Sequence, residues 1–323
     1  MNIQTLKQTA RERLDSAPTD PRRLALLHTG AAVLLSLLAT VINYLLSRQM
    51  ADTGGLSGIP LRTALTFAQS MLLLATTVLM PFWEHGFTRA MLLVSRGEQA
   101  APGDLLTGFR RFGVVLRLLL LQTVLTVAVT FACLQASAIL FMLSPWSALT
   151  AETADALLAS GAAIDEAAIN QMMQTMYPMY LILAVLVGVL LVPLLYRFRL
   201  SNWAVMDDIP RARQAMRYSA YWMHKNRFRM FRLDLSFWWY YALLGIAATA
   251  AYGDLLLPLL GINLNADVAF FGSYLVSAAV QLAVAWRFAP YVQTTYALAY
   301  QTLRAEKPPI QTAPQPKPSP WEN

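Results

Sequence analysis

Four ionisable side chains and a histidine are candidates for a buried polar cluster. Glu84, His85 and Arg89 follow one another near the inner end of a long apolar run, and Arg117 and Arg287 belong to other runs. Ionisable groups are costly inside a membrane, so each one is a candidate for function. Glu84 and Arg89 are five residues apart, which is poor spacing for a pair on one helix, so Arg117 or Arg287 could pair with Glu84 instead. A structural ion pair is favoured over a proton relay, because water reaches the ends of the runs.

A second group of candidates lies in segment 197–234, where cations alternate with aromatic side chains. From Arg211 onward the pattern predicts a basic amphipathic helix, with Asp208 as its N-cap and Pro210 in its first turn. Its cations would reach lipid phosphates with aromatic rings beneath them. The expected contacts with anionic lipid or a protein partner are Arg213, Arg217, Trp222, Lys225, Arg227, Arg229 and Arg232.

Catalytic signatures do not occur in this sequence. The histidines, His28, His85 and His224, fall on different segments, and there is no zinc-ligand spacing, phosphate-cradling glycine loop or nucleophile elbow. Asp207 and Asp208 are adjacent, but capping of a helix start explains them. We therefore expect no enzyme, no metal and no cofactor. Nucleic acid is not an expected partner either, because the net charge of +7 comes without a module that could read it.

The elements that must position these residues are the long apolar runs. Of the 323 residues 57% are hydrophobic and 13% charged, against about 25% charged in soluble domains. The expected fold is all-α, a polytopic membrane helix bundle with a membrane domain over 24–306. A span needs about 20 apolar residues, and six are predicted, at about 24–46, 61–82, 113–143, 179–196, 235–252 and 268–291.

The segments outside the spans carry further predictions. Segment 1–23 predicts an interfacial helix with one apolar face, and 307–323 predicts a disordered proline-rich tail. Of the 25 Lys and Arg residues, only Arg48 and Arg62 fall in outer loops. Cationic loops stay on the cytoplasmic side during insertion. Both termini and the basic inner loop 197–234 are therefore expected in the cytoplasm, and loop 144–178 outside, in a bacterial plasma membrane.

The stretch 219–238 resembles an uncharacterised family of bacterial multipass membrane proteins, a domain of unknown function common in Gram-positive anaerobes. The family order of Ser, Met, Lys, Phe and a Leu-Ser-Phe-aromatic run is matched by Ser219, Met223, Lys225, Phe231, Leu233, Leu235, Ser236, Phe237 and Trp238. Further matches are Pro290, Tyr291 and Tyr300, and more weakly Leu6, Lys7, Ala10, Leu14, Arg96, Gly97, Glu98 and Phe109. His224 and Asn226 depart from the usual Gly and Trp. The resemblance implies an architecture and no activity.

Three functions are compatible with these patterns. The favoured one is a non-enzymatic accessory or scaffold that acts through the basic inner segment on lipid or a membrane protein partner. The alternative is a carrier or channel for a small solute, lined by polar residues of spans two, three and six. Pro81 and Pro193 would permit helix breaks for transport, but both lie near span ends. A lipid-modifying enzyme would need clustered acids or histidines at the inner face, and Glu84 with His85 is the only pair in the sequence that could begin such a cluster.

Overall fold

The computed structural model describes residues 2–52, 59–159, 170, 173–207, 209–253 and 265–307, and every regular element in these ranges is a helix. The predicted all-α fold is therefore confirmed. The helices of the membrane part are α2 (Pro21–Asp52), α3 (Ile59–Arg96), α5 (Phe112–Met142), α6 (Pro145–Ala159), α8 (Tyr177–Leu186), α9 (Val192–Phe198), α13 (Trp238–Ala250) and α15 (Ala266–Glu306). The shorter elements are α1 (Ile3–Asp15), η2 (Pro102–Leu106), α4 (Thr107–Arg110), α10 (Ser201–Met206), α11 (Ala212–Met223) and α12 (Arg227–Leu235).

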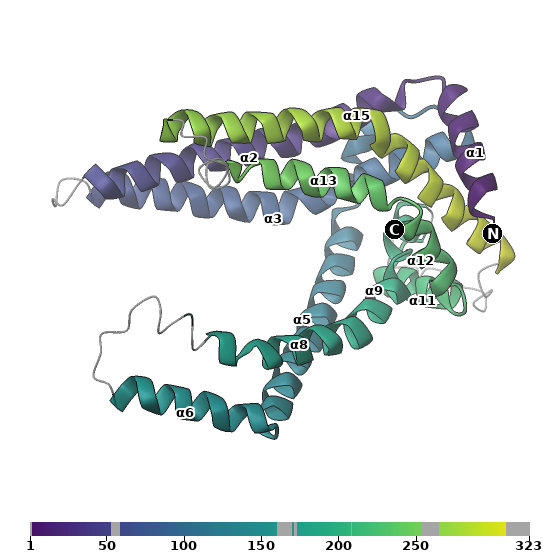
Figure 1. Cartoon of the computed structure of the whole chain (residues 1–323). Coiled ribbons are helices and arrows are strands. Elements are labelled where there is room, and N and C mark those ends of the chain that lie inside the picture. The colour runs from purple at the N-terminus through teal and green to yellow at the C-terminus, as the bar shows by residue number, and fades with distance from the viewer. Residues whose placement is uncertain are drawn as a thin grey trace, which may run out of the picture.

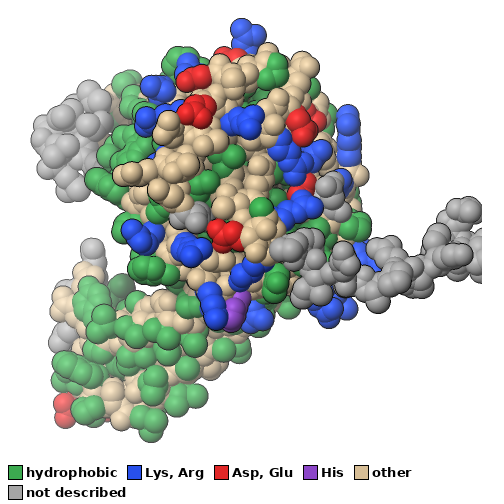
Figure 2. All heavy atoms as spheres, turned by 90° about the vertical axis from the view of Figure 1, so that its right-hand side faces the viewer, with side chains coloured by type: hydrophobic (Ala, Val, Ile, Leu, Met, Phe, Trp, Pro, Cys, Tyr) green, Lys and Arg blue, Asp and Glu red, His purple; other side chains and the backbone are tan. Residues whose placement is uncertain are grey.

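The long helices form two groups that meet at one end (Figure 1). Helices α2, α3, α13 and α15 lie side by side in the first group, and α5, α6 and α8 make up the second. Helices α1, α10, α11 and α12 gather where the groups meet, around the C-terminal turns of α3 and α15. We call this part of the molecule the basic end, because Lys and Arg side chains are spread over it in the end-on view of Figure 2.

Five helical segments in the described ranges are long and apolar enough to cross a membrane. They are Pro21–Leu46, Thr63–Arg96, Phe112–Met142, Tyr177–Met206 and Asp267–Glu306. Each overlaps a predicted span, so the protein is membrane-embedded. Helices α3 and α15 continue well past residues 82 and 291, where the sequence patterns ended the spans. Pro81 and Pro290 both lie inside these continuous helices and end neither of them.

The predicted span 235–252 corresponds to α13, which has 13 residues and a length of about 20 Å. A bilayer core is about 30 Å thick, so α13 alone is short. It runs antiparallel to α15, since Trp239 packs on Phe288 while Ser277 donates to the carbonyl of Ala247. Residues 254–264, which follow it, lie outside the described part. A total of six spans stays a prediction.

Helices α8 and α9 are joined by one turn of π-helix, η3 (Val187–Leu191). Pro193, two residues after the end of η3, has no backbone N–H to continue the α-helical pattern. A local widening of this kind is one way in which a helix accommodates such a break. The predicted fourth span therefore continues through Pro193 without interruption by a loop.

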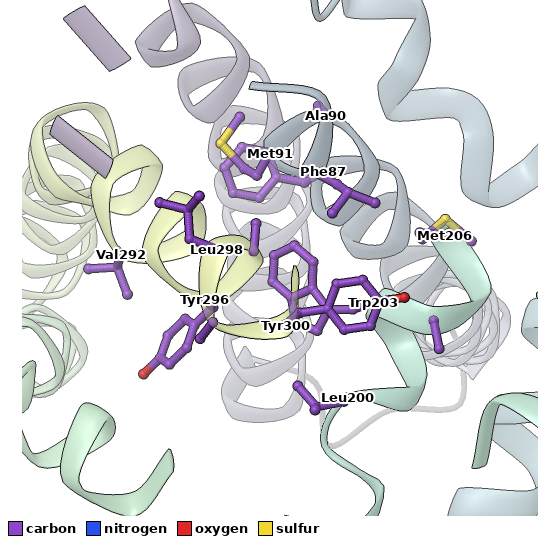
Figure 3. Close-up of a cluster of buried hydrophobic side chains, with 14 of the residues drawn as sticks. Phe87, Ala90, Met91, Leu200, Trp203, Met206, Val292, Tyr296, Leu298 and Tyr300 are labelled. Atoms are coloured by element: carbon purple, nitrogen blue, oxygen red, sulfur yellow. The ribbon is translucent and has the colours of Figure 1, made fainter. Parts of the chain in front are cut away.

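Burial is concentrated at the basic end rather than along the spans. Large side chains of the spans, such as Leu34, Leu73, Val124 and Leu181, are exposed, as expected where lipid rather than protein covers them. By contrast, Met91 of α3, Trp203 of α10 and Tyr300 of α15 converge in a packed core (Figure 3). This core fixes the positions of the charged side chains around it.

Helix α1 contributes to that core through the apolar face predicted for segment 1–23, and its place at the lipid interface stays a prediction. Its apolar face, with Leu6 and Ala10 buried, packs on α3 and α15. Lys7 donates from Nζ to the carbonyl of Ser236 at 2.9 Å, and its ammonium lies 4.2 Å from the ring centre of Phe237. Burial, and then the charge of Arg11, lower the pKa of Lys7.

Two glycines allow the connection after α3 to pack directly on that helix. A Cβ at Gly86 would overlap the carbonyl group of Leu105, and one at Gly108 would overlap that of Phe82. The obstacle is backbone in both cases, so it cannot rotate away. Segment 102–110 is thereby held against α3, and this places Arg111 beside α10.

Candidate functional site

One face of α15 carries the polar groups of the basic end. Tyr296, Tyr300 and Arg304 are four residues apart, so they lie above one another on the helix. Their side chains reach two aspartates from other helices, Asp207 after α10 and Asp234 in α12. The candidate site consists of these two carboxylates and the groups that bind them.

Asp207 has no exposed surface and accepts from three side chains. Arg96 of α3 donates to Oδ1 at 2.5 Å, Tyr300 donates to Oδ2 at 3.0 Å, and Arg304 also binds Oδ2. The backbone carbonyl of Asp207 accepts from Arg111 at 3.0 Å. A buried charge is stable only when it is paired and hydrogen-bonded, and this carboxylate is both.

Arginines also bind the backbone that leads into Asp207. Arg111 donates to the carbonyl of Val205 at 2.6 Å, and Arg89 donates to that of Met206 at 3.1 Å. Helix α10 ends here, and its last carbonyls have no partner within the helix. Three arginines of the α3–α5 region and one of α15 therefore bind the end of α10.

Asp234 is the second carboxylate and is nearly buried, with 15% of its side chain exposed. Arg199, which directly follows α9, binds both of its oxygens, with 2.6 Å between Nη2 and Oδ1. The hydroxyls of Tyr196 and Tyr296 donate to it as well, the latter at 2.6 Å. Tyr296 also lies 2.9 Å, hydroxyl to hydroxyl, from Tyr241 of α13. Asp234 thus connects α12 with α9, α13 and α15.

The chemistry available to the two carboxylates is limited by their partners. An ionised carboxylate has about four acceptor positions, and arginine and tyrosine donors occupy Asp207 and Asp234. This arrangement favours fixed ion pairs that join helix ends over a general acid or base. Among the described residues no three His, Cys, Asp or Glu side chains are placed to hold a metal ion.

The structure does not assemble the cluster predicted around Glu84. Glu84 is exposed, and no ion pair involving it occurs in the described ranges. His85 is buried and its Nδ1 lies 2.7 Å from the carbonyl oxygen of Pro81. Arg89 turns toward α10, whereas Arg117 on α5 and Arg287 on α15 are exposed on separate helices. The side chains fail to meet because α3, α5 and α15 present different faces at this level.

The basic segment 197–234 folds mainly as three short helices, α10, α11 and α12, rather than one continuous basic helix. Helix α11 begins at Ala212, with Arg211 as N-cap, so Pro210 precedes the helix rather than lying in its first turn. Asp208, the predicted N-cap, lies outside the described residues. Trp222 is fully buried, packs edge-on against Tyr300 and donates to the carbonyl of Lys307 at 2.8 Å. It is therefore a core residue and not a lipid contact.

The other predicted contact residues of this segment are exposed. They are Arg213 and Arg217 on α11, Lys225 in the turn and Arg227, Arg229 and Arg232 on α12. Lys225 adopts a left-handed backbone conformation, with φ of 67°, which turns the chain between the two helices. Arg229 is 3.4 Å from Glu306, and this exposed pair contributes little stability.

Helix α12 presents an apolar stripe between its exposed arginines. Met230 and Leu233 are buried, while Phe228, Phe231 and Leu235 are 69%, 45% and 59% exposed. The spacing of three and four residues places the three exposed side chains on one stripe of the helix. Arg227 and Arg232 flank that stripe by helical position, and Trp238, 65% exposed, continues it into α13.

Comparison with known proteins places the chain in a family. Residues 1–307 match the family described as Protein of unknown function (DUF975), so the chain belongs to that family. This confirms the resemblance to an uncharacterised family. The comparisons with curated proteins and with solved structures find no match.

Proposed function

We propose that this member of a family of unknown function is a non-enzymatic scaffold of the bacterial plasma membrane. Its basic end faces the cytoplasm and holds anionic lipid of the inner leaflet through α12. The observation that carries the proposal is the exposed stripe of Phe228, Phe231 and Leu235 between Arg227 and Arg232.

A helix with this pattern is suited to the lipid interface. Exposed aromatic rings at the end of a membrane bundle are stabilised at the level of the headgroups, and long arginine side chains reach from there to phosphates. A soluble acidic partner would require the cations but not three exposed apolar side chains in one stripe. The stripe therefore favours lipid over a soluble protein as the direct contact of α12.

The packing below α12 supports a scaffold. Ion pairs to Asp207 and Asp234 join the ends of α3, α9, α10, α12 and α15. These contacts hold the backbone of α12 in place before lipid binds, so the helix itself need not be ordered on binding. This rigidity also argues against a role in which the helix ends must move apart.

Amide exchange in lipid nanodiscs tests this proposal. We compare exchange of residues 226–236 in neutral discs and in discs with added phosphatidylglycerol. Each cation near an anionic surface contributes about 1 kcal/mol. The wild-type α12 amides are therefore expected to exchange more slowly in anionic discs. The variant Arg227→Gln/Arg232→Gln is expected to lose that difference.

The control removes two exposed arginines of the basic end that lie outside α12. Arg23→Gln/Arg110→Gln changes the net charge equally and is expected to keep the lipid-dependent protection of α12. Equal exchange of wild-type α12 in neutral and anionic discs would overturn the proposal. An equal loss of protection in both double variants would overturn the assignment to α12.

A channel for small charged solutes is the second candidate, and one cavity favours it. A space of about 410 Å³ lies between α5 and α9–α10, with Gln122, Thr126 and Asn202 in its wall. Gln122 donates to Ser201 at 2.7 Å, so part of this polar surface joins helices instead of facing a path. Ion conductance across planar bilayers tests this candidate, and a Gln122→Leu variant that abolishes a measured current would place the path here.

A further inference from the structure

A groove between the first turns of α5 and the start of α11 brings together three arginines from two segments of the chain. It has a volume of about 590 Å³, within the range of ligand sites. Its basic side chains are Arg117 of α5 and Arg211 and Arg213 at the start of α11, and its apolar side chains are Leu120, Leu121, Val124 and Ala212. Among the described residues that line it, none is acidic.

The three guanidinium groups have no counter-charge among the described residues. Arg96, Arg199 and Arg304 each bind an aspartate, but Arg117, Arg211 and Arg213 form no ion pair or side-chain hydrogen bond within the described residues. Three like charges that line one groove repel one another, and an anion between them relieves that repulsion. Since each guanidinium presents a planar fork of donors, the fitting anion has several oxygens in one group, as a phosphate does.

The apolar wall continues from the arginines toward the middle of the span. Leu120 and Val124 are four residues apart on α5 and are 55% and 66% exposed. Val124 lies seven residues after Arg117, which is about 10 Å along the helix axis. An occupant that fits both parts therefore has an anionic head and an apolar tail directed into the membrane.

We propose that this groove binds one membrane lipid with a phosphomonoester headgroup. The phosphate lies among Arg117, Arg211 and Arg213, and the first methylene groups of the tail pack along Leu120 and Val124. A phosphomonoester carries nearly two negative charges at neutral pH, whereas a phosphodiester carries one, so the phosphomonoester matches three cations better. The site shares no residue with α12, and it requires only that the basic end borders the membrane.

Native mass spectrometry of the full chain tests the site. The protein is released from discs of a neutral lipid. One set of discs contains added phosphatidic acid, a second contains twice that amount of phosphatidylglycerol to equalise the charge, and a third contains no anionic lipid. We expect one retained phosphatidic acid per chain and weaker retention of phosphatidylglycerol. Arg117→Gln/Arg211→Gln/Arg213→Gln should reduce the apparent affinity about tenfold or more for each arginine removed. The matched control is Arg22→Gln/Arg23→Gln/Arg110→Gln, which replaces three exposed arginines outside both the groove and α12 and should retain the lipid.

A second variant separates a lipid from a soluble phosphate compound. Leu120→Gln/Val124→Gln leaves the arginines in place and should weaken retention of phosphatidic acid. Inorganic phosphate or pyrophosphate at millimolar concentration should not displace the lipid from the wild type. Full displacement, together with no effect of the leucine and valine substitutions, would overturn the lipid assignment in favour of a soluble phosphate.

Three further results bear on the proposal. Equal loss of retention in the groove variant and in Arg22→Gln/Arg23→Gln/Arg110→Gln would show non-specific attraction and overturn the groove. Unchanged retention in the groove variant would overturn it as well. Loss only in the groove variant, with α12 amide exchange indifferent to lipid, would support the groove while the proposed role of α12 failed. Unfolding midpoints in neutral discs show whether each variant is folded.

Discussion

Asp207, which follows α10, and Arg304, in the last turn of α15, form an ion pair in which the carboxylate has no exposed surface. Arg96 of α3 binds the second oxygen of the same carboxylate. The pair connects residues 97 positions apart in the chain, so it joins the end of α10 to the last turn of α15. A carboxylate in this position determines how α3, α10 and α15 end relative to one another.

Replacement of Asp207 by Asn should therefore destabilise the basic end. The change leaves Arg96 and Arg304 without a counter-charge, and breaking a buried pair costs about 3–5 kcal/mol. The low end of that range applies, because the two arginine side chains are 26% and 34% exposed and can partly hydrate. Unfolding in detergent measures the effect. The control Glu98→Gln removes an exposed carboxylate and should cost less than about 0.5 kcal/mol.

The hydroxyl of Tyr296 should contribute through its bond to Asp234. Tyr296→Phe keeps the ring but removes a donor to a carboxylate, a loss of about 1.5–3 kcal/mol. Tyr291→Phe is the matched control on the same helix, since no hydrogen bond of its hydroxyl occurs in the described part of the chain. Equal unfolding free energies of the two variants would contradict a tie through Asp234.

Gly108→Ala should destabilise the contact between α4 and α3. The added Cβ would overlap the backbone of Phe82, and overpacking of this kind costs about 1–3 kcal/mol. Gly113→Ala is the control, because a Cβ there meets nothing within 4 Å and the residue lies in α5. It should be neutral or stabilising by up to about 1 kcal/mol. Destabilisation of the same size in both variants would contradict the close backbone contact.

Labelling of single cysteines tests which end faces the cytoplasm. Glu98 at the basic end and Glu152 in α6 are both exposed acids, and the buried native Cys133 is replaced by Ala. An impermeant maleimide should label Glu152→Cys on intact cells and Glu98→Cys only after permeabilisation. The reverse pattern would place the basic end outside.

The helices of this protein were predictable from its sequence, but the pairing of its charges was not. Long apolar runs determine where membrane helices lie, and five of the predicted spans overlap candidate membrane helices. The partners of Asp207 come from positions 96, 300 and 304, and no local spacing in the sequence links these positions to 207. One signal was available: Tyr296, Tyr300 and Arg304 repeat every four residues beyond the predicted span end, which indicates that the helix continues with a polar face.

In the basic segment, too, the sequence did not show which side chains are buried. Its exposed arginines were identified, yet Trp222 was assigned to the lipid interface because aromatic belts and buried cores use the same residue types. Arg117 and Arg213 were assigned to separate clusters and line one groove. Only the packing of α5 beside α11 brings them together.

The most direct measurement is the depth of α12 in the membrane. A nitroxide on Phe228→Cys in reconstituted protein is compared with one on Glu98→Cys, both without Cys133. The account predicts that the label at position 228 is relaxed more by oxygen, which concentrates in lipid, and the label at position 98 more by a water-soluble nickel chelate. Equal access of the nickel chelate to both positions would contradict contact of α12 with the bilayer.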